Sequence, residues 1–92
     1  MLKVLTCTAL LTAAMTFAPA AQAAPPDFCR DYAAAAVRQV EAARSIPACN
    51  RGVGPRWTTD YRVHFDWCLG ANPGVVEAER NARTNWLRAC RG

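Results

Sequence analysis

Residues 25–45 read PPDFCRDYAAAAVRQVEAARS, and this stretch decides the fold class. Two prolines followed by Asp27 are typical of a helix start, because the first backbone donors of a helix lack partners and a carboxylate can serve them. The pattern predicts a helix that runs to about Ser45 and ends ahead of Pro47. Its apolar face has the three- and four-residue spacing of an amphipathic helix and contains Cys29, Tyr32, Ala33, Ala36, Val37, Val40 and Ala43.

Two further helices are predicted after a loop at residues 46–57, which contains two prolines and two glycines. The first of these has Thr58 or Thr59 as its expected N-cap and ends at Gly70. The second opens with Asn72 as N-cap and Pro73 in its first turn. Residues 24–92 show no strand-like alternation, so the chain is predicted to be all-α. The apolar faces of the two helices contain Tyr61, His64, Phe65 and Cys68, then Val75, Val76, Ala82, Trp86, Leu87 and Cys90.

Residues 1–23 have the pattern of a secretory signal peptide. Lys3 precedes an apolar or weakly polar run, and Ala21-Gln22-Ala23 places small residues at the positions that signal peptidases require. We expect cleavage after Ala23, which leaves one domain of residues 24–92 in the periplasm or outside the cell. Cys7 lies too near the start for a lipoprotein site and is lost with the leader. A membrane anchor is the alternative, but the run is short and no basic flank follows it, so no membrane span is expected after cleavage.

Four cysteines remain after this cut, and an even number in a short exported chain predicts two disulfides. Zinc sites use closely spaced pairs, whereas the gaps here are 20, 19 and 22 residues. Short connections favour three helices that run up, down and up, which places the cysteines alternately at the two ends. A helix of some 16 residues is about 24 Å long, but bridged Cα atoms lie within about 7 Å. This geometry selects the pairs Cys29–Cys68 and Cys49–Cys90.

Charge and length exclude several classes of function. The net charge is +4 and falls to +3 when residues 1–23 are removed, because Lys3 is lost and no acidic residue goes with it. That charge is too modest to indicate nucleic acid, which an exported protein rarely meets. About 69 residues are also too few for a Rossmann or TIM-barrel enzyme.

Residues 56–68, RWTTDYRVHFDWC, hold the densest cluster of residues suited to a site. Asp60 lies one helical turn before His64, and we expect its carboxylate to orient the imidazole and raise its pKa. Trp67 lies beside the core positions; it either caps the core or, if exposed, forms a binding hot spot together with an arginine. The alternative is a histidine that is merely satisfied at the edge of a small core. The predicted binding residues are Arg56, Trp57, Asp60, His64 and Trp67.

A complete catalytic or metal site is not predicted. Ser45, the only serine of residues 24–92, is far from His64 in the sequence, and oxidised cysteines are not nucleophiles. Asp60 and Asp66 lie on different sides of a helix and make a poor acid–base pair. One histidine with scattered carboxylates also predicts neither a metal nor a cofactor.

Three functions therefore remain, in order of preference. The first is a non-catalytic module that binds an envelope or extracellular protein or glycan. The second is a cationic protein that engages anionic lipid or polymer through Arg80, Arg88 and Arg91 on the last helix. The third is an enzyme that depends on His64.

The cysteines are embedded in a longer pattern of residues. It reads Cys29-x-x-Tyr32-Ala33-x-x-Ala36-Val37-x-Gln39, then Cys49, then Gly54-x-Arg56-Trp57-x-x-Asp60-x-x-x-His64-x-x-Trp67-Cys68, then Glu79-x-x-x-Arg83-x-x-x-Leu87-x-x-Cys90. This pattern resembles a family of small exported bacterial four-cysteine domains. The resemblance covers residues 29–90 and implies the compartment and the cysteine framework, but no activity. It further implies structural roles for Gln39, Glu79 and Arg83, the last two of which are spaced to pair along a helix at the border of the core.

Overall fold

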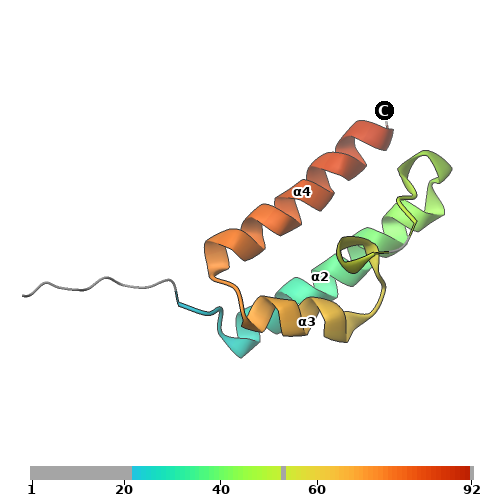
Figure 1. Ribbon diagram of the computed structural model, residues 1–92. Helices are drawn as coiled ribbons and strands as arrows, with labels where there is room; N and C mark the ends of the chain where they lie inside the picture. Colours follow the sequence, from blue (N-terminus) through green and yellow to red (C-terminus); the bar gives the residue numbers. More distant parts are fainter. Residues whose placement is uncertain (1–21, 53, 92) are drawn as a thin grey trace, which may run out of the picture.

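The computed structural model describes residues 22–52 and 54–91, and all of its regular elements are helical (Figure 1). The predicted leader lies outside the described residues, apart from Gln22 and Ala23. The all-α prediction is confirmed, and the three α-helices run up, down and up. In chain order the elements are α2 (Pro26–Ser45), the 3₁₀-helices η3 (Pro47–Cys49) and η4 (Pro55–Trp57), α3 (Tyr61–Leu69) and α4 (Pro73–Arg91).

Helix α2 has the predicted limits and the predicted inner face. Asp27 lies in its first turn, and the Ser45 hydroxyl donates to the carbonyl of Ala42 over 2.8 Å at its other end. Val37, assigned to the apolar face from the sequence, is only half-buried. Half of the buried residues on this face are alanine, a small side chain that allows α3 and α4 to approach closely. Its fully buried residues are Cys29, Tyr32, Ala33, Ala36, Val40 and Ala43.

The start of α3 differs from the prediction by one or two residues. Asp60, not Thr58 or Thr59, is the N-cap, and its Oδ1 accepts from the backbone N–H of Arg62 over 3.0 Å. The Thr58 hydroxyl instead accepts from the N–H of Asp60 over 3.0 Å, one step before the helix. A carboxylate at this position places a negative charge next to the unpaired N–H donors of the first turn, so Asp60 is a stronger cap than a threonine hydroxyl. Gly70 follows the helix as predicted.

Helix α4 begins as predicted, with the Asn72 Oδ1 accepting from the N–H of Val75 over 3.0 Å. Its buried residues are Val76, Arg83 and Leu87. Val75 was expected on the apolar face, but it is 49% exposed. Neighbouring helical residues point about 100° apart, so a stripe through Val76 leaves Val75 facing solvent.

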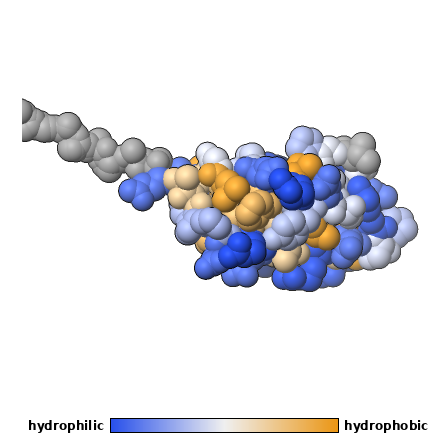
Figure 2. All heavy atoms as spheres, turned by 90° about the horizontal axis from the view of Figure 1, so that it is seen from below, coloured by the Kyte–Doolittle hydropathy of each residue, from blue (hydrophilic) through white to orange (hydrophobic). Residues whose placement is uncertain are grey.

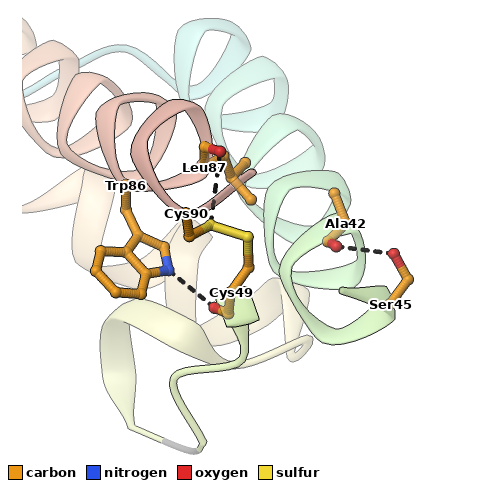
Figure 3. Close-up of a disulfide and its surroundings, with 6 residues drawn as sticks. All are labelled: Ala42, Ser45, Cys49, Trp86, Leu87 and Cys90. Atoms are coloured by element: carbon orange, nitrogen blue, oxygen red, sulfur yellow. Dashed lines mark hydrogen bonds between the residues drawn. A yellow bond between two sulfur atoms is a disulfide. The ribbon is translucent and has the colours of Figure 1, made fainter. Parts of the chain in front are cut away.

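The two disulfides join the predicted pairs and hold the two ends of the bundle. Cys29–Cys68 links the start of α2 to the end of α3 across a Cα–Cα distance of 5.5 Å. Cys49–Cys90 links η3 to the end of α4 across 5.2 Å, and the Trp86 indole beside it donates to the Cys49 carbonyl over 2.8 Å (Figure 3).

Each disulfide belongs to its own hydrophobic cluster. The first cluster contains Ala24, Cys29, Tyr32, Ala36, Cys68 and Val76. The second contains Ala43, Cys49 and Leu87, with Trp57 packed against it. Seen from below, hydrophobic residues form a patch on this face, and hydrophilic residues surround it (Figure 2).

The hydrophobic core includes a residue that lies before the first helix. Ala24 is only 4% exposed and belongs to the first cluster. Its backbone N–H donates to the carbonyl of Ala71, in the connection between α3 and α4, over 2.7 Å. Gln22 and Ala23 are exposed, so the buried part of the chain begins at Ala24.

Candidate functional site

A cavity of about 290 Å³ lies where four elements meet. Three of the five predicted binding residues line it: Arg56, His64 and Trp67. Helix α2 contributes Tyr32 and α4 contributes Glu79 and Arg83, whereas α3 contributes Val63, His64 and Trp67 and η4 contributes Pro55 and Arg56. We call the buried residues among them, Tyr32, His64 and Arg83, the floor of the cavity. The complete lining is Tyr32, Pro55, Arg56, Val63, His64, Trp67, Glu79 and Arg83.

The guanidinium of Arg83 is buried beneath the cavity and is held from three sides. Its Nε donates to Oε1 of Gln39 over 2.8 Å, and its Nη2 donates to the Tyr32 hydroxyl over 2.7 Å. Its Nη1 donates to the backbone carbonyl of Arg56 over 3.4 Å. A buried charge requires such a set of partners because it has given up its hydration. The implied structural roles of Gln39 and Arg83 are therefore visible in the contacts.

Glu79 is shared by two guanidinium groups. Its two carboxylate oxygens accept from Nε and Nη2 of Arg56, the latter over 2.9 Å. Its Oε2 also lies 3.6 Å from Nη1 of Arg83, one helical turn away. The carboxylate raises the pKa of the Arg56 guanidinium, whose side chain is 51% exposed. Glu79 thus connects the buried arginine to the one at the rim.

Tyr32 is the centre of the floor. Its ring lies 5.7 Å from that of Trp67 and 6.2 Å from that of His64, which it meets edge to face. Burial raises the pKa of the Tyr32 phenol, although the hydrogen bond from Arg83 acts in the opposite direction. Trp67 covers this floor and is still 41% exposed. Of the two sequence alternatives for Trp67, the exposed position at a cavity is the one observed.

His64 does not pair with Asp60, so the predicted orienting role of that carboxylate is wrong. The Nε2 atom lies 2.7 Å from the carbonyl oxygen of Thr58, and since a carbonyl only accepts, Nε2 carries the hydrogen. Asp60 is occupied as the cap of α3. Because α3 turns His64 inwards, its side chain is buried and its exposed fraction is 3%.

The pKa of His64 moves opposite to the direction expected from the sequence. Burial lowers it from the ordinary value of 6.5, and the positive charge of Arg83 adds to this effect. The hydrogen bond to Thr58 and the charges of Asp60 and Glu79 oppose the shift without reversing it. A neutral imidazole follows at neutral pH.

Acid is therefore expected to destabilise the fold through His64. Below the ordinary pKa of 6.5 the unfolded chain takes up a proton that the folded chain resists, so stability falls as pH falls. The urea midpoint should decrease from pH 7 to about pH 5, above the range in which carboxylates titrate. His64→Gln, which keeps a donor for Thr58, should flatten this dependence. An equally steep dependence in that variant would contradict the assignment.

Trp57 and Asp60 lie outside the cavity. Trp57 packs on the cluster of the second disulfide. It lines a separate depression of about 350 Å³, in which the Arg51 guanidinium lies 4.2 Å from the centre of the Trp86 ring. These two predicted site residues therefore do not contribute to the same surface as His64 and Trp67.

Sequence reasoning did not identify Tyr32, Pro55, Val63, Glu79 and Arg83 as site residues. Tyr32 gave one usable signal, since a tyrosine on a buried helix face needs a partner for its hydroxyl. Glu79 and Arg83 had been assigned structural roles, and both also line the cavity. Pro55 and Val63 carried no signal in the sequence.

The chemistry of the cavity lining comes from His64, Tyr32, Glu79 and the two arginines. The lining contains no serine or cysteine, and the imidazole of His64 is buried against Thr58. Within residues 22–52 and 54–91, no three side chains of histidine, cysteine, aspartate or glutamate are grouped to hold a metal ion. No helix in the same residues has the length and hydropathy needed to cross a membrane.

Comparison of the chain with protein-family models, with curated proteins and with solved structures found no match.

Proposed function

We propose that this protein is an exported, non-catalytic module that binds a protein or glycan of the cell envelope or its surroundings at the cavity of Arg56, His64 and Trp67. The observation that carries the proposal is the 41% exposure of Trp67 above a fully buried floor. Tryptophan and arginine are enriched among the residues that dominate binding energy, most of all where a pocket excludes water. Here both types border one cavity.

The floor of the cavity is fixed before any partner arrives. Tyr32, Gln39 and Arg83 are joined by side-chain hydrogen bonds of 2.7 and 2.8 Å. Trp67 rests on Tyr32, which limits the side-chain freedom that binding would remove. Such preorganisation favours affinity because less entropy is lost on association.

Export is part of the proposal. It is supported by the leader pattern of residues 1–23 and by the resemblance to small exported four-cysteine domains. The two disulfides support it further, since such bonds persist in oxidising compartments. We propose that the chain belongs to that group of domains and that its leader ends at Ala23.

The second candidate, a cationic protein that engages lipid or polymer through α4, receives less support from the contacts. Arg80 lies 3.4 Å from Glu77 in an ion pair, and its side chain is only 30% exposed. Arg88 and Arg91, in the last turn, leave a small cationic surface. The enzyme hypothesis gains nothing from His64, because the imidazole is buried and hydrogen-bonded to the backbone.

Removing Trp67 should abolish partner binding without unfolding the protein. Trp67→Ala should lose capture of a partner from an envelope extract and keep the circular dichroism of the wild type. Tyr61→Ala is the matched control, because Tyr61 is an aromatic residue of α3 with 38% exposure that does not line the cavity. Equal capture by wild type and Trp67→Ala, or no capture by the wild type, would overturn the proposal.

A further inference from the structure

The charges that line the cavity do not balance. Arg56 and Arg83 are both cationic, and Glu79 is the only carboxylate among the lining residues. That carboxylate is already shared, since it forms two hydrogen bonds with Arg56 and lies 3.6 Å from Arg83. His64 adds no positive charge at neutral pH, because burial lowers its pKa. One positive charge is therefore left without a counter-charge in the wall of the cavity.

Arg56 can reach a ligand with donors that Glu79 does not use. A guanidinium has five N–H groups, and the two bonds to Glu79 take one each from Nε and Nη2. The Arg56 side chain is 51% exposed, so the side chain remains accessible to a ligand. Arg83, by contrast, is completely buried, so it contributes only the electrostatic attraction of its positive charge and no direct contact.

The cavity lining also contains exposed apolar side chains. Trp67 is 41% exposed and Val63 is 39% exposed, and they lie one turn apart on α3. Pro55 lines the cavity beside Arg56. A molecule bound here would meet both a cation and apolar surface.

We propose that the cavity binds a carboxylate attached close to an aromatic or aliphatic group. The carboxylate lies on Arg56 beside Glu79, and the apolar group packs on Trp67 and Val63. A single negative charge matches the single unbalanced positive charge, whereas a phosphate dianion would bring one more negative charge than the lining can balance. A cationic ligand is disfavoured by the two guanidinium groups, even though an exposed tryptophan can attract cations.

This inference rests on the proposed function and deepens it, because it names the chemistry by which the partner is held. The same chemistry occurs in a small free acid and in an acidic residue next to an aromatic one in a protein. Phenylacetate represents the first source, and the capped peptide acetyl-Gly-Asp-Phe-Gly-amide represents the second.

The test is a titration of the oxidised, ¹⁵N-labelled protein with each probe. Nuclear magnetic resonance monitors the chemical shifts of the Trp67 indole N–H and the Val63 backbone amide during the titration. At least one probe should shift both signals saturably. Phenylacetamide, which lacks the charge, should bind about tenfold more weakly than phenylacetate, as expected for a lost charge-assisted hydrogen bond. Acetate, which lacks the ring, should shift neither signal at the same concentration.

Matched variants assign the contacts. Arg56→Gln should weaken binding about tenfold, because the amide keeps donors but loses the charge. Arg62→Gln is the control, since Arg62 is an arginine of the same region with 75% exposure that does not line the cavity. Tighter binding of phenylacetate would indicate a small free acid as the natural ligand, and tighter binding of the peptide would indicate a protein.

Equal binding of phenylacetate and phenylacetamide, or no saturable shift with either probe, would overturn the carboxylate inference. The proposed function would still stand in that case if partner capture remained dependent on Trp67. Saturable binding of a probe combined with partner capture that does not need Trp67 would support the carboxylate inference and contradict the proposed function.

Discussion

Reduction of the two disulfides should unfold this protein at ambient temperature. The bridges span sequence separations of 39 and 41 residues, and closing a loop of that size contributes about 3–4 kcal/mol in the chain-entropy model. A domain of this length has a total stability of only about 3–5 kcal/mol. Far-ultraviolet circular dichroism should fall, and tryptophan emission should shift towards that of the denatured chain, when a reductant is added.

Single substitutions should show the same loss one bridge at a time. Cys68→Ser and Cys49→Ser each remove one bridge and should expose tryptophan, whereas Cys7→Ser, in the predicted leader, should not. The native protein should be lighter by four hydrogens than its reduced form, since it contains two bridges. Native dichroism and emission in the reduced protein would contradict the dependence on disulfides.

Replacement of Arg83 should be the most damaging change outside the cysteines. Arg83→Met leaves the Tyr32 hydroxyl, Gln39 and Glu79 without their shared donor, and breaking a buried charged contact costs about 3–5 kcal/mol. Arg83→Lys should recover little, because one ammonium cannot occupy the separate directions of a guanidinium. Urea denaturation of the oxidised protein measures both losses.

Arg88 provides the comparison for Arg83 on the same helix. Arg88 is exposed, so Arg88→Met and Arg88→Lys should change the free energy of unfolding by no more than about 0.5 kcal/mol. An Arg83→Lys protein as stable as Arg88→Lys would show that the charge alone is sufficient and that the hydrogen-bond geometry is not needed.

The helices and the disulfides were predictable because their signals are local or geometric. Asn72-Pro73 marks the start of α4, and the apolar spacing from Cys29 to Ala43 marks the inner face of α2. The pairing of the cysteines followed from helix length, since cysteines at opposite ends of a helix cannot meet. These arguments need no knowledge of side-chain contacts between elements.

The candidate site was only partly predictable, because competing partners cannot be ranked from spacing. Asp60 is one turn from His64 and also one position before α3. Its carboxylate accepts a hydrogen bond from the first turn of α3 and does not pair with the imidazole. Trp57 was expected in the same site because it lies in the same dense segment as His64, yet it precedes α3, which begins at Tyr61, and closeness in the sequence does not bring the two side chains to one surface.

The cavity itself joins residues from four elements. Tyr32 and Arg83 lie 51 positions apart and meet through a hydrogen bond of 2.7 Å. No local pattern carries such a contact, and helix periodicity alone would place an apolar residue at position 83. The Arg83 guanidinium is accommodated there because polar groups of other elements converge on it.

If the proposed leader is cleaved after Ala23, the burial of Ala24 bears on the order of cleavage and folding. Signal peptidase would cut the bond between Ala23 and Ala24, and the nitrogen of that bond is the one that donates to Ala71. A protease binds its substrate as an extended strand through backbone hydrogen bonds. In a domain that had already folded, the nitrogen of Ala24 would be hydrogen-bonded to Ala71, so the enzyme could not bind this bond in the extended form. Cleavage before folding frees an ammonium group at Ala24 that can take the same position, just beyond the carboxyl end of α3, where the helix dipole favours positive charge. If the leader is removed there, the relative speeds of proteolysis and folding, and not the recognition sequence alone, decide which molecules keep it.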